Sequence, residues 1–485
     1  MTSTANGASE AGAASAPSGA RGASAESRDG RSFSFRAGAE DGVAPGDMVI
    51  LTTADGARLL GQVVDVAESV LDQPLSGHGV VIGRLDGSHA VARADRPPFR
   101  GATLTQARPH ELGGLDGTTG GTMTIGTWRT GDVGAPANLR AGGFNRHTFL
   151  CGQSGSGKTY ALGVLLERLL LQTELRMAVF DPNADFVHLG STLPGVPEAE
   201  AARIADRGVR VLRSDSTRTD ADEPLRMRFR TMTRQAQAAT LQLDPVRDQD
   251  EYNAFISFLA QISPATEMGA MLAALRSGTP GQQSLAQRME NLGMLEWQVW
   301  ARDLPSAADV VTTGNGVTVM DLGGFGDPAE AVAVCLEVVD ELWAQRDRRV
   351  PTLLVIDEAH NLCGTEPASP VAQRLLDRLI QIAAEGRKYG LWLLLSSQRP
   401  SKIHPQILSQ CDNLMLMRMN SPDDVAELGR AFGFAPRSML QASNGFVQGE
   451  ALLAGGFAPV PMLVQMRERL TRQGGSDVAV PLVGA

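Results

Sequence analysis

The sequence predicts an α/β protein in which a small β-barrel precedes a mainly parallel sheet and a helical insertion interrupts that sheet. Three patterns predict this fold. Between about Gly46 and Thr130, short apolar strands are separated by Gly, Asp and Pro, a spacing typical of a small barrel. From about Asn145 onward, apolar strands alternate with helical stretches, which is the pattern of a parallel sheet. Between about Ser191 and Val310, the alternation loosens into mostly helical sequence.

These patterns divide the chain into domains. Residues 1–40 are rich in Ala, Gly and Ser and contain little to bury, so we expect a disordered tail. We expect the barrel in residues 41–135 and the sheet domain in residues 136–470, with the helical insertion at residues 191–310. Residues 471–485 are expected to form a C-terminal tail.

The expected strands are short in the barrel and strongly apolar in the sheet domain. Continuous apolar runs are typical of parallel strands covered on both faces. In the barrel, we expect strands at residues 48–51, 61–66, 80–83 and 122–125. In the sheet domain, we expect them at residues 148–151, 177–181, 317–321, 352–357, 391–396 and 414–417.

Composition limits the classes of protein to which the chain can belong. No apolar run approaches the roughly 18 residues of a membrane span, and no secretory signal is visible, so we expect a cytoplasmic protein without a membrane segment. The four cysteines lack CxxC spacing, which argues against a disulfide framework or a zinc site. The net charge of −10 argues mildly against nucleic-acid binding. That argument is weak for a ring, where a basic pore can lie inside an acidic exterior.

The most specific motif follows the expected strand at residues 148–151. It matches GxxxxGK[ST] and reads Gly152-Gln153-Ser154-Gly155-Ser156-Gly157-Lys158-Thr159. A helix is expected at residues 160–171, so that backbone N–H groups and the helix N-terminus, including Tyr160, would face a phosphate. Lys158 would reach the β- and γ-phosphates of ATP, and the hydroxyl of Thr159 would bind Mg²⁺. A chance match in a Gly-rich chain is the alternative, but the expected strand and helix on either side argue against it.

A second motif supplies two acids at the end of an apolar strand. Residues 353–356 are Leu, Leu, Val and Ile, and Asp357 and Glu358 follow directly. Asp357 would hold Mg²⁺ through water, and Glu358 would activate the attacking water. Adjacent acids after a strand can also be ordinary solvated loop residues. Together with the phosphate-binding loop, however, they indicate hydrolysis of ATP.

A third motif places a polar side chain at the end of the apolar strand at residues 391–396. Gln398 suits a sensor that touches the γ-phosphate or the attacking water. The alternative is that Gln398 caps a turn before Pro400.

The order of these and further motifs resembles the HerA family, hexameric DNA translocases related to FtsK and to the ATPases of conjugation systems. The further motifs are Asp181-Pro182-Asn183-Ala184-Asp185-Phe186, Ile356-Asp357-Glu358-Ala359-His360, Glu385-Gly386-Arg387-Lys388-Tyr389-Gly390, Ser397-Gln398-Arg399-Pro400-Ser401-Lys402 and Leu408-Ser409-Gln410-Cys411. The resemblance covers roughly residues 45 to 470. It implies a RecA-like P-loop ATPase core behind a small β-barrel. It also implies a homohexamer with ATP sites between subunits and double-stranded DNA in the central channel.

The resemblance also assigns Arg387 as a finger that reaches the γ-phosphate of the neighbouring subunit. A fixed, delocalised cation stabilises charge on the transferring phosphoryl group, which is an independent reason for an arginine there. The alternative is an ion pair between Arg387 and a nearby carboxylate such as Glu385. Lys388 and Lys402, the only lysines besides Lys158, could serve the site or the pore, but each alone reads as a solvated surface cation.

Four other residues have structural alternatives to a functional role. Asp181 and Asp185 could position Mg²⁺ or water, or else cap the next helix. His360 beside the acids is more often structural than catalytic. Trp297 and Trp300 read as core anchors, although an exposed pair could be a partner surface.

The leading hypothesis is therefore an ATP-driven DNA translocase or helicase that works with a separately encoded nuclease or NAD-consuming effector, in DNA processing or antiphage defence. The chain shows no nuclease motif of its own. One alternative is a scaffold ATPase ring that assembles and activates an effector with little DNA translocation. A conjugative or secretion motor is disfavoured because no membrane anchor is visible.

Overall fold

The structure, a computed structural model, describes residues 23–67, 74–87, 89–91, 97–129, 134–263, 266–314 and 316–475. The chain divides into two compact units, Met1–Ala107 and Arg108–Ala485. Each unit has its own sheet, as the sequence predicts, although the boundary between them lies earlier than expected.

The first unit is a β-barrel built from antiparallel strands. Its sheet has the order β2-β1-β7-β3-β4-β5-β6, and pairing of β2 with β5 closes the barrel. Along β2 the burial alternates, so that Phe33 and Phe35 point into the core with Val49, Leu51 and Val63. The strands are β1 (Ser24–Ser27), β2 (Ser32–Ala37), β3 (Met48–Thr52), β4 (Arg58–Ala67), β5 (Leu75–Asp86), β6 (His89–Val91) and β7 (Phe99–Gln106), with a 3-10 turn at Ala39–Asp41.

The predicted N-terminal tail of residues 1–40 is too long. Residues 1–22 lie outside the described part of the chain, but β1 and β2 are strands of the barrel. Composition hides them because Ser and Ala dominate. The alternation of Phe33 and Phe35 with polar residues is the strand signal, since both rings are buried.

The second unit contains a 12-stranded sheet of order β13-β12-β14-β11-β15-β16-β10-β17-β18-β19-β8-β9. The strands from β13 to β17 are parallel, and those from β17 to β9 are antiparallel. The strands are β8 (Met123–Trp128), β9 (Pro136–Leu139), β10 (His147–Cys151), β11 (Arg176–Asp181), β12 (Val209–Arg213), β13 (Glu223–Pro224), β14 (Val317–Asp321), β15 (Thr352–Ile356), β16 (Leu391–Ser397), β17 (Cys411–Leu416), β18 (Glu450–Gly455) and β19 (Met462–Met466). The α/β fold with a mainly parallel sheet is confirmed.

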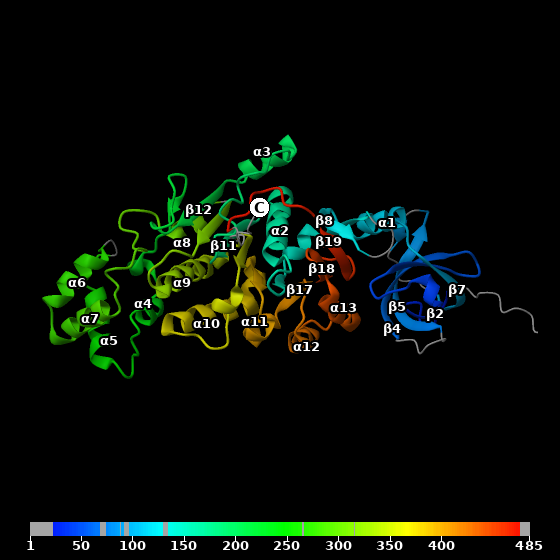
Figure 1. The fold of residues 1–485 in the computed structure, drawn as a ribbon. Helices are drawn as coiled ribbons and strands as arrows, with labels where there is room; N and C mark the ends of the chain where they lie inside the picture. Colours follow the sequence, from blue (N-terminus) through cyan, green and yellow to red (C-terminus); the bar gives the residue numbers. More distant parts are fainter. Residues whose placement is uncertain are drawn as a thin grey trace, which may run out of the picture. The chain divides into compact units, whose positions relative to one another are not determined.

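Helices cover both faces of this sheet. Helices α2 and α3 lie on one side, and α8, α9 and α10 lie on the other (Figure 1). The α-helices are α1 (Pro109–Thr119), α2 (Lys158–Gln172), α3 (Glu198–Asp206), α4 (Arg234–Thr240), α5 (Gln249–Leu259), α6 (Met268–Arg276), α7 (Pro280–Asn291), α8 (Ala307–Thr313), α9 (Pro328–Ala344), α10 (Pro370–Glu385), α11 (Pro405–Leu408), α12 (Pro422–Ala431) and α13 (Arg437–Ala442). Among the helices that the structure describes, none is long and apolar enough to cross a bilayer.

The strand expected at residues 122–125 does not belong to the barrel. It forms β8, which pairs with β19 and so extends the sheet of the second unit. Gly126 allows this pairing, since a Cβ atom there would lie 2.1 Å from the carbonyl oxygen of Gln465. The predicted barrel boundary at residue 135 is therefore corrected to Ala107.

The insertion at residues 191–310 is mostly helical but not separate from the sheet. Within it, β12 pairs with β14 and β13 pairs with β12, so both strands extend the parallel sheet. Helices α5, α6 and α7 form a cluster at one end of this unit (Figure 1). Trp297 and Trp300 stack with their ring centroids 5.4 Å apart, and Trp297 is only 7% exposed, as expected of core anchors.

Candidate functional site

The loop of residues 152–159 connects a buried strand to a helix, the context that a phosphate-binding loop requires. It follows β10, and α2 begins at Lys158. Gly155 and Gly157 have φ angles of 74° and 90°, a left-handed backbone that favours glycine. The first turn of α2 thus presents its N–H groups at the end of the loop, where they can bind an anion.

Lys158 lies at the centre of a buried polar cluster. Its Nζ donates hydrogen bonds to Asp357 Oδ1 at 3.2 Å, Glu358 Oε1 at 3.0 Å and Ser396 Oγ at 3.0 Å. The Lys158 side chain is 4% exposed. The ends of β15 and β16 supply the acids and the serine, since β10 lies beside β16 and β16 beside β15. The structure therefore brings together the loop and the two acids that the sequence singles out.

Glu358 has the environment of a carboxylate that stays ionised. Burial pushes its pKa up, but the Lys158 ammonium and the Gln398 amide outweigh burial and hold the pKa below its usual value. Its backbone is left-handed, with φ 44°, an uncommon conformation for a residue with a side chain. An ionised carboxylate can accept a proton from water.

Gln398 extends from the end of β16 toward the acids. Its Nε2 donates to Glu358 Oε1 at 2.8 Å, and its side chain borders the same cavity as Lys158 and Thr159. Gln398 therefore reaches the acids, and its role as a sensor stays a prediction. The alternative role, a cap of the turn before Pro400, belongs instead to the hydroxyl of Ser397, which accepts the N–H of Arg399.

His360 contacts the same cluster, although the sequence gives it only a structural role. Its Nδ1 lies 3.3 Å from Glu358 Oε2 and 3.3 Å from Ser397 Oγ. Burial lowers the pKa of His360, and nearby Arg399 and Lys158 lower it further against the charge of Glu358. A neutral imidazole is therefore part of the setting of Glu358 at neutral pH.

Asp181 is the last residue of β11, and Asp185 lies in the turn that follows it. The carboxylate of Asp181 accepts the N–H groups of Asp185 and Phe186 at 3.0 and 2.8 Å, and so holds the turn after the strand. Burial raises the pKa of Asp181 to about 7 and, with the charge of Asp357, that of Asp185 to about 6. Asp181 therefore holds this turn and does not cap a helix, and a role of Asp181 and Asp185 in positioning Mg²⁺ or water stays a prediction.

Arg387 lies far from Lys158 of its own chain. It occupies the turn Gly386–Tyr389 before β16, at the N-terminal ends of the parallel strands. The phosphate-binding loop lies at their C-terminal ends. A five-residue strand such as β10 spans about 15 Å. Arg387 Nη1 pairs with Asp412 Oδ2 at 2.6 Å, so an ion pair with a nearby carboxylate is present, although its partner is Asp412 and not Glu385.

The two other lysines and the four cysteines contribute no side chain to the Lys158 cluster. Lys388 and Lys402 are exposed, in agreement with solvated cations. The four cysteines, Cys151, Cys335, Cys363 and Cys411, are buried and free.

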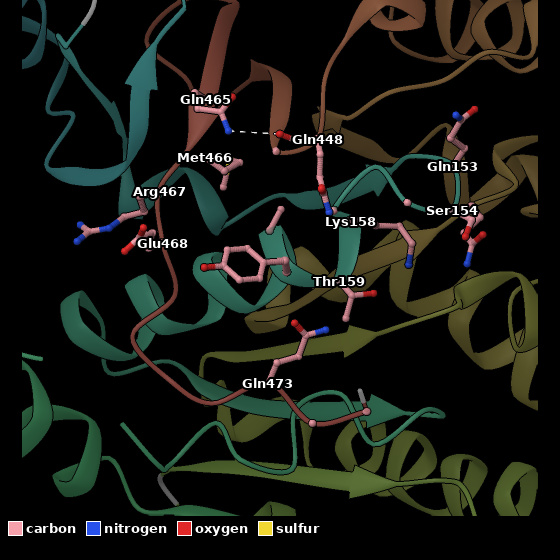
Figure 2. A pocket seen from close by; sticks show the side chains of 18 residues that line it. Gln153, Ser154, Lys158, Thr159, Gln448, Gln465, Met466, Arg467, Glu468 and Gln473 are labelled. Atoms are coloured by element: carbon pink, nitrogen blue, oxygen red, sulfur yellow. Dashed lines mark hydrogen bonds between the residues drawn. The ribbon is translucent and has the colours of Figure 1, made fainter. Parts of the chain in front are cut away.

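A cavity of about 650 Å³ opens over the loop and the start of α2. One side is formed by Gln153, Ser154, Gly155, Gly157, Lys158 and Thr159, followed by Tyr160. Figure 2 shows Gln153, Ser154 and Lys158 on one side of the cavity and Arg467 and Glu468 on the other, with Thr159 between them. Its size suits a nucleotide.

Residues of the C-terminal segment border this cavity, and sequence reasoning missed them. The cavity is lined by Gln465, Met466, Arg467, Glu468 and Gln473. Of these, Gln473 belongs to residues 471–485, which are expected to form a tail. Residues 476–485 of that predicted tail lie outside the described part of the chain. Ser396, which accepts from Lys158, was also missed. The C-terminal segment carries no motif, and Ser396 belongs to the buried strand of the third motif, so only the folded structure reveals their contacts with the site.

The sequence of the chain is similar to those of known helicases. A family model described as the central domain of helicase HerA matches residues 123–292, starting at the first residue of β8. The DNA double-strand break repair helicase HerA of Sulfurisphaera tokodaii is 23% identical over 421 residues, which cover 81% of this chain and 78% of that protein. The probable helicase MJECL08 of Methanocaldococcus jannaschii is 33% identical over 144 residues, and this match spans only 26% of that protein.

Two solved structures show more distant likeness. The bacterial conjugative coupling protein TrwBΔN70 with sulphate has 14% identity and a TM-score of 0.46, covering 75% of this chain and 95% of that one. The genome packaging NTPase B204 of Sulfolobus turreted icosahedral virus 2 with AMPPCP has 11% identity and a TM-score of 0.33, covering 67% of this chain and 99% of that one.

Proposed function

We propose that this chain, a member of the HerA family of P-loop ATPases, hydrolyses ATP in a hexameric ring and moves along double-stranded DNA. The observation that carries the ATPase assignment is the cluster of Lys158, Asp357 and Glu358 at the ends of β10 and β15, the two strands that flank β16. The assignment to DNA rests on the HerA helicases that resemble the chain over most of its length.

In this proposal the phosphates of ATP lie on the N–H groups of the loop and the first turn of α2, with Lys158 between the β- and γ-phosphates. Lys158 exchanges its contacts with the two carboxylates for contacts with phosphate oxygens. Glu358 accepts a proton from the attacking water, and Gln398, hydrogen-bonded to Glu358, orients that water.

Thr159 and Asp357 fit a Mg²⁺ ion. The Oδ2 atom of Asp357 is buried and accepts no hydrogen bond from the described residues, so it is available to a metal-bound water. A hydroxyl and a carboxylate are oxygen ligands of the kind that Mg²⁺ prefers. When bound, Mg²⁺ would neutralise charge on the β- and γ-phosphates.

Arg387 would complete the site of the neighbouring subunit. Arg387 lies at the N-terminal ends of the parallel strands, away from Lys158 of its own chain. An arginine that acts between subunits requires such a position. In the ring, Arg387 would leave Asp412 and contact the γ-phosphate next door.

The ring would work with a separately encoded nuclease or NAD-consuming effector, in DNA processing or in antiphage defence. The test is ATP turnover with and without double-stranded DNA, together with displacement of a bound streptavidin from a biotinylated DNA end. We expect DNA to stimulate turnover and ATP to drive displacement. Turnover that is indifferent to DNA, without displacement, would favour the scaffold ring instead.

A further inference from the structure

The cavity extends beyond the part that the phosphates of a nucleotide would fill. The phosphate end of a nucleotide is fixed by the loop at residues 152–159, yet the cavity continues past Tyr160 to the C-terminal strap, which we define as residues 467–475. Arg467 and Glu468 of this strap lie at the side of the cavity away from Ser154, and Gln473 faces it from below Thr159 in Figure 2.

The strap is held on one face of α2. The N–H of Arg469 donates to the hydroxyl of Tyr160 at 2.8 Å. The carboxylate of Glu167 accepts the N–H groups of Leu470 and Thr471 at 2.8 and 2.9 Å. Tyr160 and Glu167 are seven positions apart, so they lie on the same face of the helix that begins at Lys158.

Gly163 lies between these two anchors and lets the strap come close. A Cβ atom at Gly163 would lie 2.5 Å from Cζ of Arg469. The Arg469 side chain is 1% exposed and pairs with Glu167, which is fully buried. Because this guanidinium cannot swing into solvent, any side chain at residue 163 would push the strap away from α2.

The far end of the strap is fixed as well. The N–H of Arg472 donates to Ser191 O at 3.0 Å, and that of Gly474 donates to Asp185 O at 3.1 Å. The strap is therefore pinned at both ends and along α2, although its residues match no motif.

We propose that the strap holds the adenosine part of the nucleotide, with Arg467 in contact with the base or ribose. This inference rests on the proposed ATPase function, because it takes the phosphates to lie on the loop. Polar side chains on a rigid wall give hydrogen bonds to a base and ribose at little entropic cost. Gly163 and Glu167 act as positioning residues, since they hold the strap and do not line the cavity.

The test compares two ligands, ATP and inorganic tripolyphosphate, each with Mg²⁺ and each measured by displacement of a fluorescent ATP analogue. Tripolyphosphate carries the phosphates of ATP without adenosine. Arg467→Ala should weaken ATP about tenfold, as expected for one lost hydrogen bond, and should leave tripolyphosphate affinity unchanged. Gly163→Ala should weaken ATP in the same selective way, through displacement of the strap.

The matched control is Arg472→Ala, which removes the same charge from the strap at an exposed position that does not line the cavity. It should bind both ligands like the wild type. Lys158→Ala should lose both ligands.

The outcomes separate the two proposals. If the wild type binds neither ligand, the ATPase function fails. If it binds ATP but Arg467→Ala binds ATP equally well, only the strap proposal is overturned. Equal weakening of both ligands in this variant would also overturn it, because the effect would then concern the phosphate site.

Discussion

Glu358 is the residue on which hydrolysis depends most in the proposed mechanism. Glu358→Gln keeps the size of the side chain and an oxygen near Lys158, but it cannot take a proton from water. We expect ATP binding to remain and turnover to fall about 10²- to 10⁴-fold. Single-turnover hydrolysis and ATP binding measured on one preparation would check this. Glu366→Gln, at an exposed position on the same connection, should turn over ATP like the wild type, whereas normal turnover in Glu358→Gln would require another base.

In the proposed mechanism Lys158 contacts the phosphates of ATP, and in the structure its ammonium group pairs with two carboxylates. Lys158→Ala should abolish or severely weaken ATP binding, since the cation of the loop is lost. Isothermal titration with ATP would measure the loss, and Lys402→Ala, at an exposed lysine, is the control. Undiminished affinity in Lys158→Ala would mean that the loop is wrongly assigned.

At the scale of elements, local signals were predictable and long-range pairings were not. The six strands expected between residues 148 and 417 all exist, because continuous apolar runs mark buried parallel strands. The loop, Asp357, Glu358 and Gln398 could be found because each follows such a strand directly.

The parts that could not be predicted depend on contacts between distant segments. Whether residues 123–128 join the barrel or the other sheet depends on β19, which no local pattern in β8 reveals. The end of the strap, residues 471–475, likewise reads as part of a tail, because the order of the strap comes from hydrogen bonds to Glu167 and Tyr160 on α2.

The start of β10 contains a buried histidine that makes stability depend on pH. His147 Nε2 lies 3.0 Å from Ala383 O, and its Nδ1 accepts the N–H of Leu393 at 2.9 Å, an arrangement that needs the neutral ring. Burial, helped by Arg387 and Arg146, lowers its pKa to about 4. Between the unfolded value of about 6.5 and pH 4, the unfolded chain binds a proton that the folded chain does not.

The free energy of unfolding should therefore fall as the pH falls through this window, by roughly 3 kcal/mol from this one group. His147→Gln should be less stable at neutral pH but should lose less stability between pH 6.5 and pH 4. Denaturant unfolding at several pH values would measure both slopes. The control is His110→Gln, at an exposed position on α1, and an unchanged pH slope in His147→Gln would contradict the assignment.

At the scale of the whole molecule, the negative net charge of the chain limits where DNA could bind. The net charge is −10, so contacts to DNA phosphates must come from a restricted basic surface. We expect a hexamer of about 300 kDa, six times the 51.3 kDa chain, whose DNA affinity falls steeply with added salt and depends little on sequence. Light scattering and DNA titrations at several salt concentrations would check both points. Monomers alone in the presence of ATP and DNA would contradict the ring.

The position of Arg387 makes the assembly itself testable. If Arg387 acts on the neighbouring subunit, Arg387→Ala should assemble and bind ATP nearly normally, yet hydrolyse it about 10³-fold more slowly or worse. The control is Lys388→Ala, which removes the adjacent exposed cation and should keep its activity.

Mixing two inactive variants then decides whether the arginine acts between subunits. In a ring of Arg387→Ala and Glu358→Gln chains, some sites have an intact Glu358 from an Arg387→Ala subunit and an intact Arg387 from its neighbour. Those sites are complete, so partial ATPase activity should return. An arginine that acts within its own chain cannot be rescued in this way, because every subunit keeps its lesion. If mixed rings form, as shown by native mass spectrometry, and no activity returns, the ion pair of Arg387 with Asp412 is its structural role and not a resting position.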